Sequence, residues 1–196
     1  MYMNIELVLA SNSIRRREIL ERTGIDFSLD AADIDENLGI DDPEELVREL
    51  SYRKAASVAP KHRGKAVLGA DTIVVLGKDI LGKPKDEEDA FQMLSKLSGN
   101  THKVYTGVTI LKLQDKEPPV PEELRDTFCC MSEVTMYELD PELIRSYIAT
   151  GEPMDKAGSY GIQDIGAILI KEIRGSYHNV VGLPIGEVWR HLREFL

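Results

Sequence analysis

The chain has 196 residues, of which 42% are hydrophobic and 30% are charged, and its formal net charge is −10. A protein that binds duplex nucleic acid usually presents a basic face, so this charge argues against a nucleic-acid partner. A small anionic ligand is still compatible with it if the ligand site is locally positive or holds a metal ion. No apolar run is long enough for a membrane helix, and the first residues lack the features of a signal peptide. We therefore expect a cytoplasmic protein with no membrane partner, folded as a single domain over residues 1–196.

The N-terminal region combines a short strand with an unusual helix start. The apolar residues 7–10 predict the strand, and a helix is expected over residues 13–22. The first turn of this helix carries Arg15, Arg16 and Arg17, although cations there oppose the helix dipole. An anion bound at the helix N-terminus would explain the arrangement, because guanidinium groups match phosphate oxygens. The alternative is a solvated basic face, and side chains spaced about 100° apart cannot all face one ligand.

The second predicted helix runs from Asp42 to Val58, with proline at its first position and acids in its first turn. Its apolar stripe contains Val47 and Leu50, and Lys54 falls on the same stripe. Lys54 either lays its methylene stem along the core with its ammonium in water, or reaches inward to a buried anion. The spacing leaves both readings open.

Asp71 interrupts the nearly continuous apolar and β-branched run of residues 66–76, which predicts a strand covered on both faces. A carboxylate in such a strand is costly unless it is paired, hydrogen-bonded or bound to a metal. Gly69 just before it indicates a bulge or a close backbone approach. The alternative is an aspartate at a strand end that caps a turn. No turn residue follows for several positions, which favours a functional carboxylate.

The rest of the chain mixes helices and strands. The expected segments are a hairpin turn at 77–79 returning through 80–81, a helix at 86–97, strands at 102–113 and 126–139, a poorly ordered Pro-rich link at 117–121, a helix at 140–151, a glycine-rich loop at 152–166, a strand at 166–173 and a helix at 184–195. Together they predict an α/β fold with a twisted mixed β-sheet flanked by helices and two lobes around a central cleft.

Three further candidate residues have weaker local patterns. Lys83 precedes a proline, which favours an extended conformation and lets the side chain project from a strand end. Gln163 lies in a glycine-rich stretch, and its amide can accept from N3–H of uracil or thymine and donate to O4. Glu36 lies among other acids, a pattern that is typical of a solvated loop.

Several sequence blocks occur in order along nearly the whole chain: SNSIRR at 11–16, RKA at 53–55, GADTIV at 69–74, LGKP at 81–84, HKVYTGV at 102–108, GEPMDKAGSYGIQ at 151–163 and NVVGLP at 179–184. With these blocks the chain resembles the Maf family of nucleoside triphosphate pyrophosphatases. The resemblance implies a mixed α/β, ITPase-like fold. It also implies hydrolysis of a nucleoside triphosphate between its α and β phosphorus atoms. The products are a nucleoside monophosphate and pyrophosphate.

The block at 151–163 is similar to the branch of the family that acts on dTTP, UTP and modified pyrimidine nucleotides, whereas a sister branch prefers 7-methyl-GTP. By position in the family pattern, Asp71 is the proton acceptor, and Arg15, Thr72 and Gln163 tune the choice of base. The positions that match phosphate or metal handling are Ser11, Arg16, Glu36, Lys54 and Lys83. Three residues depart from the pattern: Ile14 replaces a usual proline, Asn12 a small residue and Asp164 a frequent glycine.

A triphosphate carries about four negative charges, which an acidic protein must screen locally. We expect Ser11, Arg16, Lys54 and Lys83 to contribute to phosphate binding. A divalent cation, Mg²⁺ or Mn²⁺, is expected to bridge Glu36 and Asp71 through hard oxygen ligands. The family resemblance also admits a homodimer. Two alternatives of other classes are a regulator of cell division that binds the nucleotide without cleaving it, and a structural partner in cell division with a vestigial site.

Overall fold

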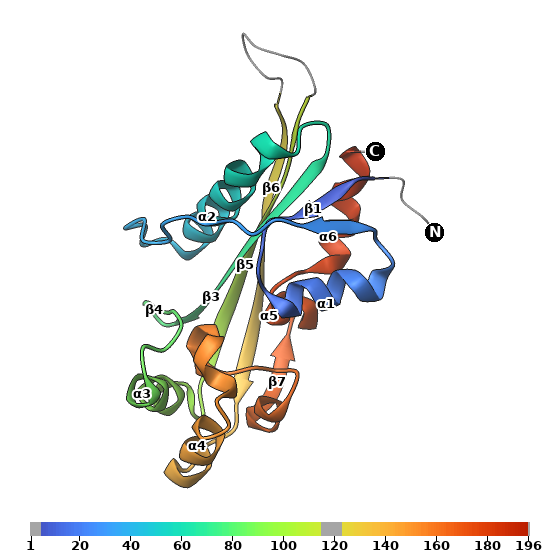
Figure 1. Cartoon of the computed structure of the whole chain (residues 1–196). Coiled ribbons are helices and arrows are strands. Elements are labelled where there is room, and N and C mark those ends of the chain that lie inside the picture. Colours follow the sequence, from blue (N-terminus) through green and yellow to red (C-terminus); the bar gives the residue numbers. More distant parts are fainter. Residues whose placement is uncertain (1–4, 115–122, 196) are drawn as a thin grey trace. The chain divides into compact units, whose positions relative to one another are not determined.

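The structure is a computed structural model that describes residues 5–114 and 123–195. The predicted Pro-rich link at 117–121 lies outside the described residues. The chain forms two compact units: the first comprises Met1–Asp71, Thr106–Cys130 and Gly182–Leu196, and the second comprises Thr72–Tyr105 and Met131–Val181. Three strands, β3, β5 and β6, contribute residues to both units (Figure 1).

The described residues form a seven-stranded mixed sheet in the order β2-β1-β3-β5-β6-β7, with β4 paired to β3. The strands are β1 (Leu7–Leu9), β2 (Phe27–Leu29), β3 (Ala66–Leu76), β4 (Asp79–Leu81), β5 (Thr101–Leu113), β6 (Glu123–Met136) and β7 (Ile170–Arg174). Strand β1 is parallel to β2 and β3, whereas β4 is antiparallel to β3 and β7 to β6. The predicted mixed sheet is confirmed.

The helices are α1 (Ile14–Thr23), α2 (Pro43–Val58), α3 (Glu87–Leu97), α4 (Pro141–Ile148), α5 (Tyr177–Val181) and α6 (Ile185–Leu192). Ser13 caps α1 by accepting a hydrogen bond from the Arg16 amide, and Gly24 ends the helix in the left-handed region at φ 68°. Asp42 caps α2 by accepting from the amide of Glu45 at 2.8 Å. Among the described residues, no helix combines the length and apolar character needed to cross a bilayer.

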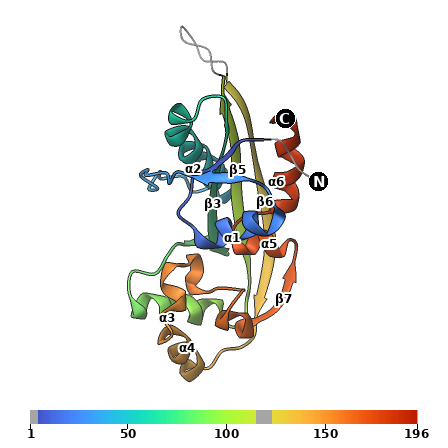
Figure 2. The same cartoon turned by 45° about the vertical axis from the view of Figure 1, so that its right-hand side comes forward.

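In the first unit, α2 and α6 lie on opposite sides of the strands (Figures 1 and 2). Two glycines let α2 pack directly on the sheet. A Cβ on Gly69 would lie 2.2 Å from the carbonyl oxygen of Ser51, and a Cβ on Gly107 would lie 2.1 Å from that of Val47. No side chain fits at such distances, so the feature predicted at Gly69 is a close approach between helix and strand. The core beneath α2 contains Val8, Ala10, Ala55, Val58, Ala59, Val67 and Leu111.

The second unit has its own core, in which α3 packs against α4. Its largest fully buried side chains include Leu94, Leu97, Met136, Tyr147 and Leu169. The burial of a complete tyrosine in α4 indicates that its hydroxyl has internal partners, because an unpaired buried hydroxyl would be costly.

Several boundaries differ from the prediction. Strand β6 spans Glu123–Met136 rather than 126–139, and it ends where the Met136 amide donates to the carbonyl of Asn100 outside the strand ladder. The strand predicted at 166–173 begins only at Ile170, because Ile165–Leu169 forms a 3₁₀ helix. The C-terminal α-helix ends at Leu192, and residues Arg193–Phe195, which the prediction included in it, form a 3₁₀ helix.

Two short elements, β2 and α5, were not predicted from the sequence.

The helix predicted at 140–151 stops at Ile148, because Gly151 adopts a left-handed φ of 76°. The α/β fold class is confirmed, whereas the central cleft and the single domain stay predictions.

Candidate active site

The first unit gathers its candidate residues beyond the carboxyl end of β1, beside the middle of β3. Leu9 of β1 lies opposite Leu68 of β3, and β3 continues past the end of β1 to Asp71. The chain leaving β1 turns through Ser11 and enters α1 at Ser13. The N-terminus of α1 and Asp71 therefore both lie beyond the carboxyl end of β1. Ligands of α/β proteins bind at the carboxyl ends of the strands.

Lys54 connects the two carboxylates of the predicted site. Its Nζ donates to Asp71 Oδ1 at 2.6 Å and lies 2.6 Å from Glu36 Oε1. The side chains of Lys54 and Asp71 are 12% and 10% exposed, whereas that of Glu36 is 59% exposed. Of the two readings of Lys54, the inward reach to a buried anion is confirmed. The close packing at Gly69 makes this contact possible, because it brings α2 against β3.

Arg16 approaches the same carboxylates from α1. Its Nη1 donates to Ser11 Oγ at 3.3 Å, and its Nε donates to the carbonyl of Gly182 at 2.8 Å. Burial lowers the pKa of the Arg16 guanidinium, while the negative charges of Asp71 and Glu36 act in the opposite direction. The first unit thus brings together Ser11, Arg16, Glu36, Lys54 and Asp71, as expected for a shared site.

The other two arginines of α1 differ in role. Arg17 donates from Nε to Glu21 at 2.7 Å, and its side chain is 54% exposed. Arg17 therefore belongs to a solvated basic face, the alternative that the sequence left open. The charge of Arg15 contributes to the lowered pKa of Arg16, which places it near the cluster.

Three predicted site residues belong to the second unit. Thr72 follows Asp71 in β3, Lys83 follows β4, and Gln163 lies between two 3₁₀ helices. Their participation in one site with Asp71 stays a prediction.

The candidate metal ligands of the site are the carboxylates of Asp71 and Glu36. Within residues 5–114 and 123–195, no group of three or more His, Cys, Asp or Glu side chains is arranged to hold a metal ion. Asp71 and Glu36 share the Lys54 ammonium between them. Mg²⁺ is usually bound by one or two carboxylates together with substrate phosphates and water. The carboxylates of Asp71 and Glu36 are oxygen donors of the kind that Mg²⁺ takes, and within the described part of the chain they do not form a complete protein cage.

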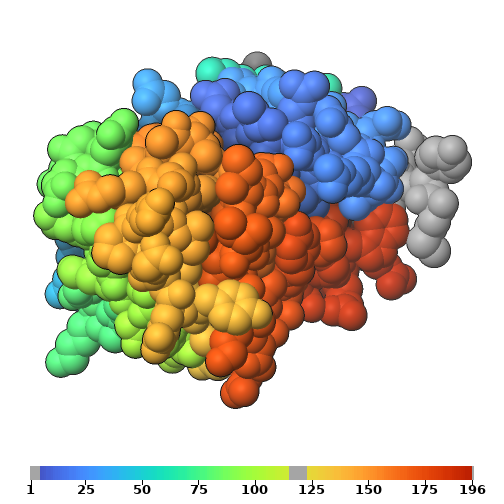
Figure 3. Space-filling view, turned by 90° about the horizontal axis from the view of Figure 1, so that it is seen from below, coloured from blue at the N-terminus to red at the C-terminus, as the bar shows by residue number. Residues whose placement is uncertain are grey.

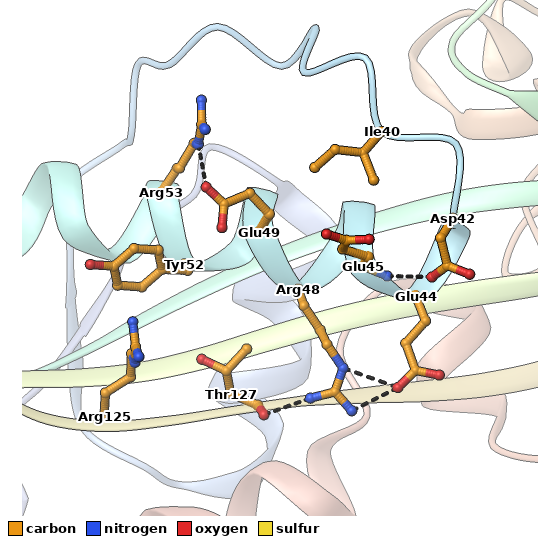
Figure 4. A pocket seen from close by; sticks show the side chains of 10 residues that line it. All are labelled: Ile40, Asp42, Glu44, Glu45, Arg48, Glu49, Tyr52, Arg53, Arg125 and Thr127. Carbon is orange, nitrogen blue, oxygen red and sulfur yellow. Dashed lines mark hydrogen bonds and ion pairs between the residues drawn. The ribbon is translucent and has the colours of Figure 1, made fainter.

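A separate pocket of about 800 Å³ lies along α2 and the first half of β6 (Figure 4). Its arginines have partners within it: Arg48 pairs with Glu44 and donates to the carbonyl of Thr127, and Arg53 pairs with Glu49. None of the ten residues that line it is a predicted site residue. We interpret it as a polar surface groove.

Sequence reasoning missed the backbone carbonyl of Gly182, which holds the Arg16 side chain, and it also missed the side chains of Tyr147 and Glu152. A backbone acceptor has no sequence signal. The signal for Glu152 was its position in a glycine-rich block, which by itself does not say what the carboxylate binds.

Comparisons with known proteins identify the family of the chain. A HAM1 protein from Coxiella burnetii has a similar fold, with a TM-score of 0.50 at 16% identity over 97% of this chain and 99% of the other. The dTTP/UTP pyrophosphatase of Bacillus cytotoxicus is 47% identical over 97% of this chain and 95% of the relative, and that of Bacillus cereus is 46% identical over the same shares. The family model described as Maf-like protein matches residues 6–195. The resemblance identified from the sequence blocks is therefore confirmed: the chain belongs to the Maf family.

Proposed function

We propose that this protein hydrolyses dTTP, UTP and modified pyrimidine nucleotides to the nucleoside monophosphate and pyrophosphate. The relatives from two Bacillus species carry the name dTTP/UTP pyrophosphatase and align over nearly the full length of the chain. The observation that carries the proposal is the buried Lys54–Asp71 contact beside Arg16. It combines a proton acceptor with positive charge for phosphate, which is what this hydrolysis needs.

Asp71 acts as the general base. Lys54 holds its Oδ1, which orients the carboxylate toward a water molecule. The water oxygen forms a new bond to the α-phosphorus as its proton passes to Asp71. The bond between the α-phosphorus and the oxygen that bridges to the β-phosphorus breaks, and that oxygen leaves with pyrophosphate. Such a base contributes about 10²–10⁴-fold to the rate.

Positive groups stabilise the charge that develops on the leaving pyrophosphate. Arg16 has a fixed position through Ser11 and the Gly182 carbonyl, so little reorganisation accompanies its action. We assign Ser11, Arg16, Lys54 and Lys83 to phosphate binding. The charges of Arg16 and Lys54 are offset by those of Asp71 and Glu36, so a triphosphate needs positive charge beyond these two side chains.

A divalent cation, Mg²⁺ or Mn²⁺, is our proposed source of that charge, with Glu36 and Asp71 as its protein ligands. When bound, it would neutralise phosphate charge as a Lewis acid. Its fit to the site rests on the two carboxylates that share Lys54.

Base selection is assigned to Arg15, Thr72 and Gln163. The Gln163 amide has both the acceptor and the donor that the N3–H and O4 edge of uracil or thymine requires. The proposed small-molecule partner of this protein is its nucleotide substrate. A homodimer and a cytoplasmic location stay predictions.

The test is a panel of dTTP, UTP, modified pyrimidine triphosphates, purine triphosphates and 7-methyl-GTP, with products separated as monophosphate and pyrophosphate. We expect more pyrophosphate release from dTTP, UTP and modified pyrimidine triphosphates than from purine triphosphates and 7-methyl-GTP. Preference for 7-methyl-GTP would assign the chain to the sister activity. Binding of dTTP or UTP without release of any pyrophosphate would support the regulator and contradict our proposal.

A further inference from the structure

The segment from Gly161 to Gly166 is held together at both ends by one carboxylate and one hydroxyl. Tyr147 Oη donates to Glu152 Oε1 at 2.9 Å and accepts from the Gly161 amide at 3.0 Å. The Gly166 amide donates to the same Glu152 oxygen at 3.1 Å, and the Ile165 amide donates to Oε2 at 3.0 Å. Glu152 thus accepts three hydrogen bonds, and together with Tyr147 it closes the segment into a loop.

The two glycines are needed for this closure. A Cβ on Gly166 would lie 2.3 Å from the Gly161 carbonyl oxygen and 2.6 Å from Tyr147 Oη. A Cβ on Gly161 would lie 2.9 Å from Glu152 Oε1. The backbones of the two residues therefore approach as closely as they do only because Gly166 has no side chain, and Gly161 leaves room for the Glu152 carboxylate.

The ends of the loop are anchored in the core of the second unit, and its middle is accessible. Tyr147 is 2% exposed, and the preceding Tyr160 is 6% exposed with its hydroxyl 2.7 Å from His102 Nε2. Gln163, between the two ends, is half-buried, and Asp164 is exposed. Figure 3 shows orange atoms, the colour of this part of the sequence, on the face that is seen from below.

We propose that Glu152 is a positioning residue for base selection: it fixes the closed loop from which Gln163 is presented to the pyrimidine base. This inference rests on the proposed function, which assigns Gln163 to the base. An amide reads a base edge only when its oxygen and nitrogen point in fixed directions, so a rigid support increases discrimination. Glu152 acts through Gln163 and does not itself contact the substrate in this scheme.

The arrangement also explains why the support is a carboxylate. Three donors converge on it, namely one hydroxyl and two backbone amides. Only an ionised carboxylate accepts at both oxygens without presenting a donor of its own. An amide at this position would turn its NH₂ group toward one of the donors, and the loop would open at that point.

The experiment compares Glu152→Gln with the wild type on dTTP, UTP and GTP. We expect the KM for dTTP and UTP to rise by about tenfold while kcat stays within about twofold, because the residues assigned to chemistry are unchanged. The preference for pyrimidines over GTP should fall by a similar factor. Glu142→Gln is the matched control, since Glu142 is an exposed acid in the first turn of α4, and it should leave all three quantities unchanged.

Two further measurements separate positioning from a general structural role. The double variant Glu152→Gln/Gln163→Ala should lose no more selectivity than Gln163→Ala alone, because Glu152 acts through Gln163. Amide hydrogen exchange at Gly161, Ile165 and Gly166 should speed up in Glu152→Gln. If Glu152→Gln does not fold, Tyr147→Phe takes its place, because it removes one hydroxyl and keeps the buried ring. It should raise the KM for dTTP and UTP by a smaller factor.

The outcomes are distinct. A wild type that does not hydrolyse dTTP or UTP overturns the proposed function and this inference with it. An active wild type with unchanged KM and base preference in the Glu152 and Tyr147 variants overturns this inference alone. Equal losses of kcat on all three nucleotides, or additive losses in the double variant, would show a purely structural role and also overturn it.

Discussion

The replacement of Asp71 by asparagine tests the central assignment, because it removes the charge and the basicity of the side chain at nearly constant volume. We expect kcat for dTTP to fall at least about 100-fold, the lower end of the contribution of a general base. This loss corresponds to about 2.7 kcal/mol of transition-state stabilisation. The amide oxygen can still accept from Lys54, so the orientation of the side chain is largely kept.

The same change affects folding stability, and the two effects must be separated. The side chains of Asp71 and Lys54 are 10% and 12% exposed, so the lost ion pair is poorly compensated by water. Glu36 still contacts Lys54 at 2.6 Å, which limits the penalty. We expect a loss of about 1–3 kcal/mol in the free energy of unfolding, and a decrease of about 3–10 °C in Tm for a chain of this length.

Activity is measured as pyrophosphate release under saturating dTTP at 25 °C, with circular dichroism to establish that the variant is folded. The control is Asp79→Asn, because Asp79 and its partner Lys96 are 62% and 56% exposed and lie 3.3 Å apart. It should change neither kcat nor Tm measurably. A folded Asp71→Asn enzyme with kcat within about threefold of the wild type would refute the role of Asp71 as the base.

Three further predictions follow from the structure. Gly69→Ala would place a methyl group 2.2 Å from the Ser51 carbonyl oxygen and should lower the free energy of unfolding by about 1–3 kcal/mol or more; a urea midpoint equal to that of the wild type would contradict the close packing. Excess EDTA should abolish dTTP hydrolysis, and Mg²⁺ or Mn²⁺ should restore it; full activity in EDTA would exclude the proposed cation. Burial lowers the pKa of His102 to about 4. Between pH 6.5 and pH 4 the His102 imidazole is therefore protonated in the unfolded chain and neutral in the folded one. The free energy of unfolding must then fall as the pH decreases through this range. The loss is about 3 kcal/mol, and urea titrations at several pH values should show it in the wild type and not in His102→Gln.

Much of the fold follows from local patterns in the sequence. The turn of the β3–β4 hairpin, with Gly77 at φ 63°, and the caps of α1 and α2 occur where the residue types predict them. Strand β2 did not follow, because three residues that pair only at one edge of the sheet have too little length for a periodic signal. Residues 166–169 of the 3₁₀ helix at Ile165–Leu169 fall within the predicted strand, because their apolar side chains are compatible with either structure. Glu152 decides between them by binding the backbone of Ile165 and Gly166.

The candidate site divides in the same way. Asp71 could be singled out because it is a charged residue in a strand that the pattern assigns to the core, and burial of a charge requires a partner. For Lys54 the spacing left both readings open, and the structure decides between them. Nothing in the sequence says that each is the partner of the other, since that depends on how closely α2 packs on β3. Gly69 and Gly107, which set this distance, can be seen in the sequence, but the sequence does not show which helix packs on them.

Glu36 shows the limit of periodic reasoning most clearly. It lies in a segment without regular structure and is 59% exposed, so its surroundings resemble those of a solvated loop. Its position at the site follows from the Lys54 ammonium, which lies 2.6 Å from both carboxylates. The two acids are therefore unequal: the backbone of Asp71 is fixed within β3, whereas no regular element fixes that of Glu36. A proton acceptor must keep its place relative to the α-phosphorus, and this requirement favours Asp71 as the base and leaves Glu36 the less constrained role of a charge partner or metal ligand.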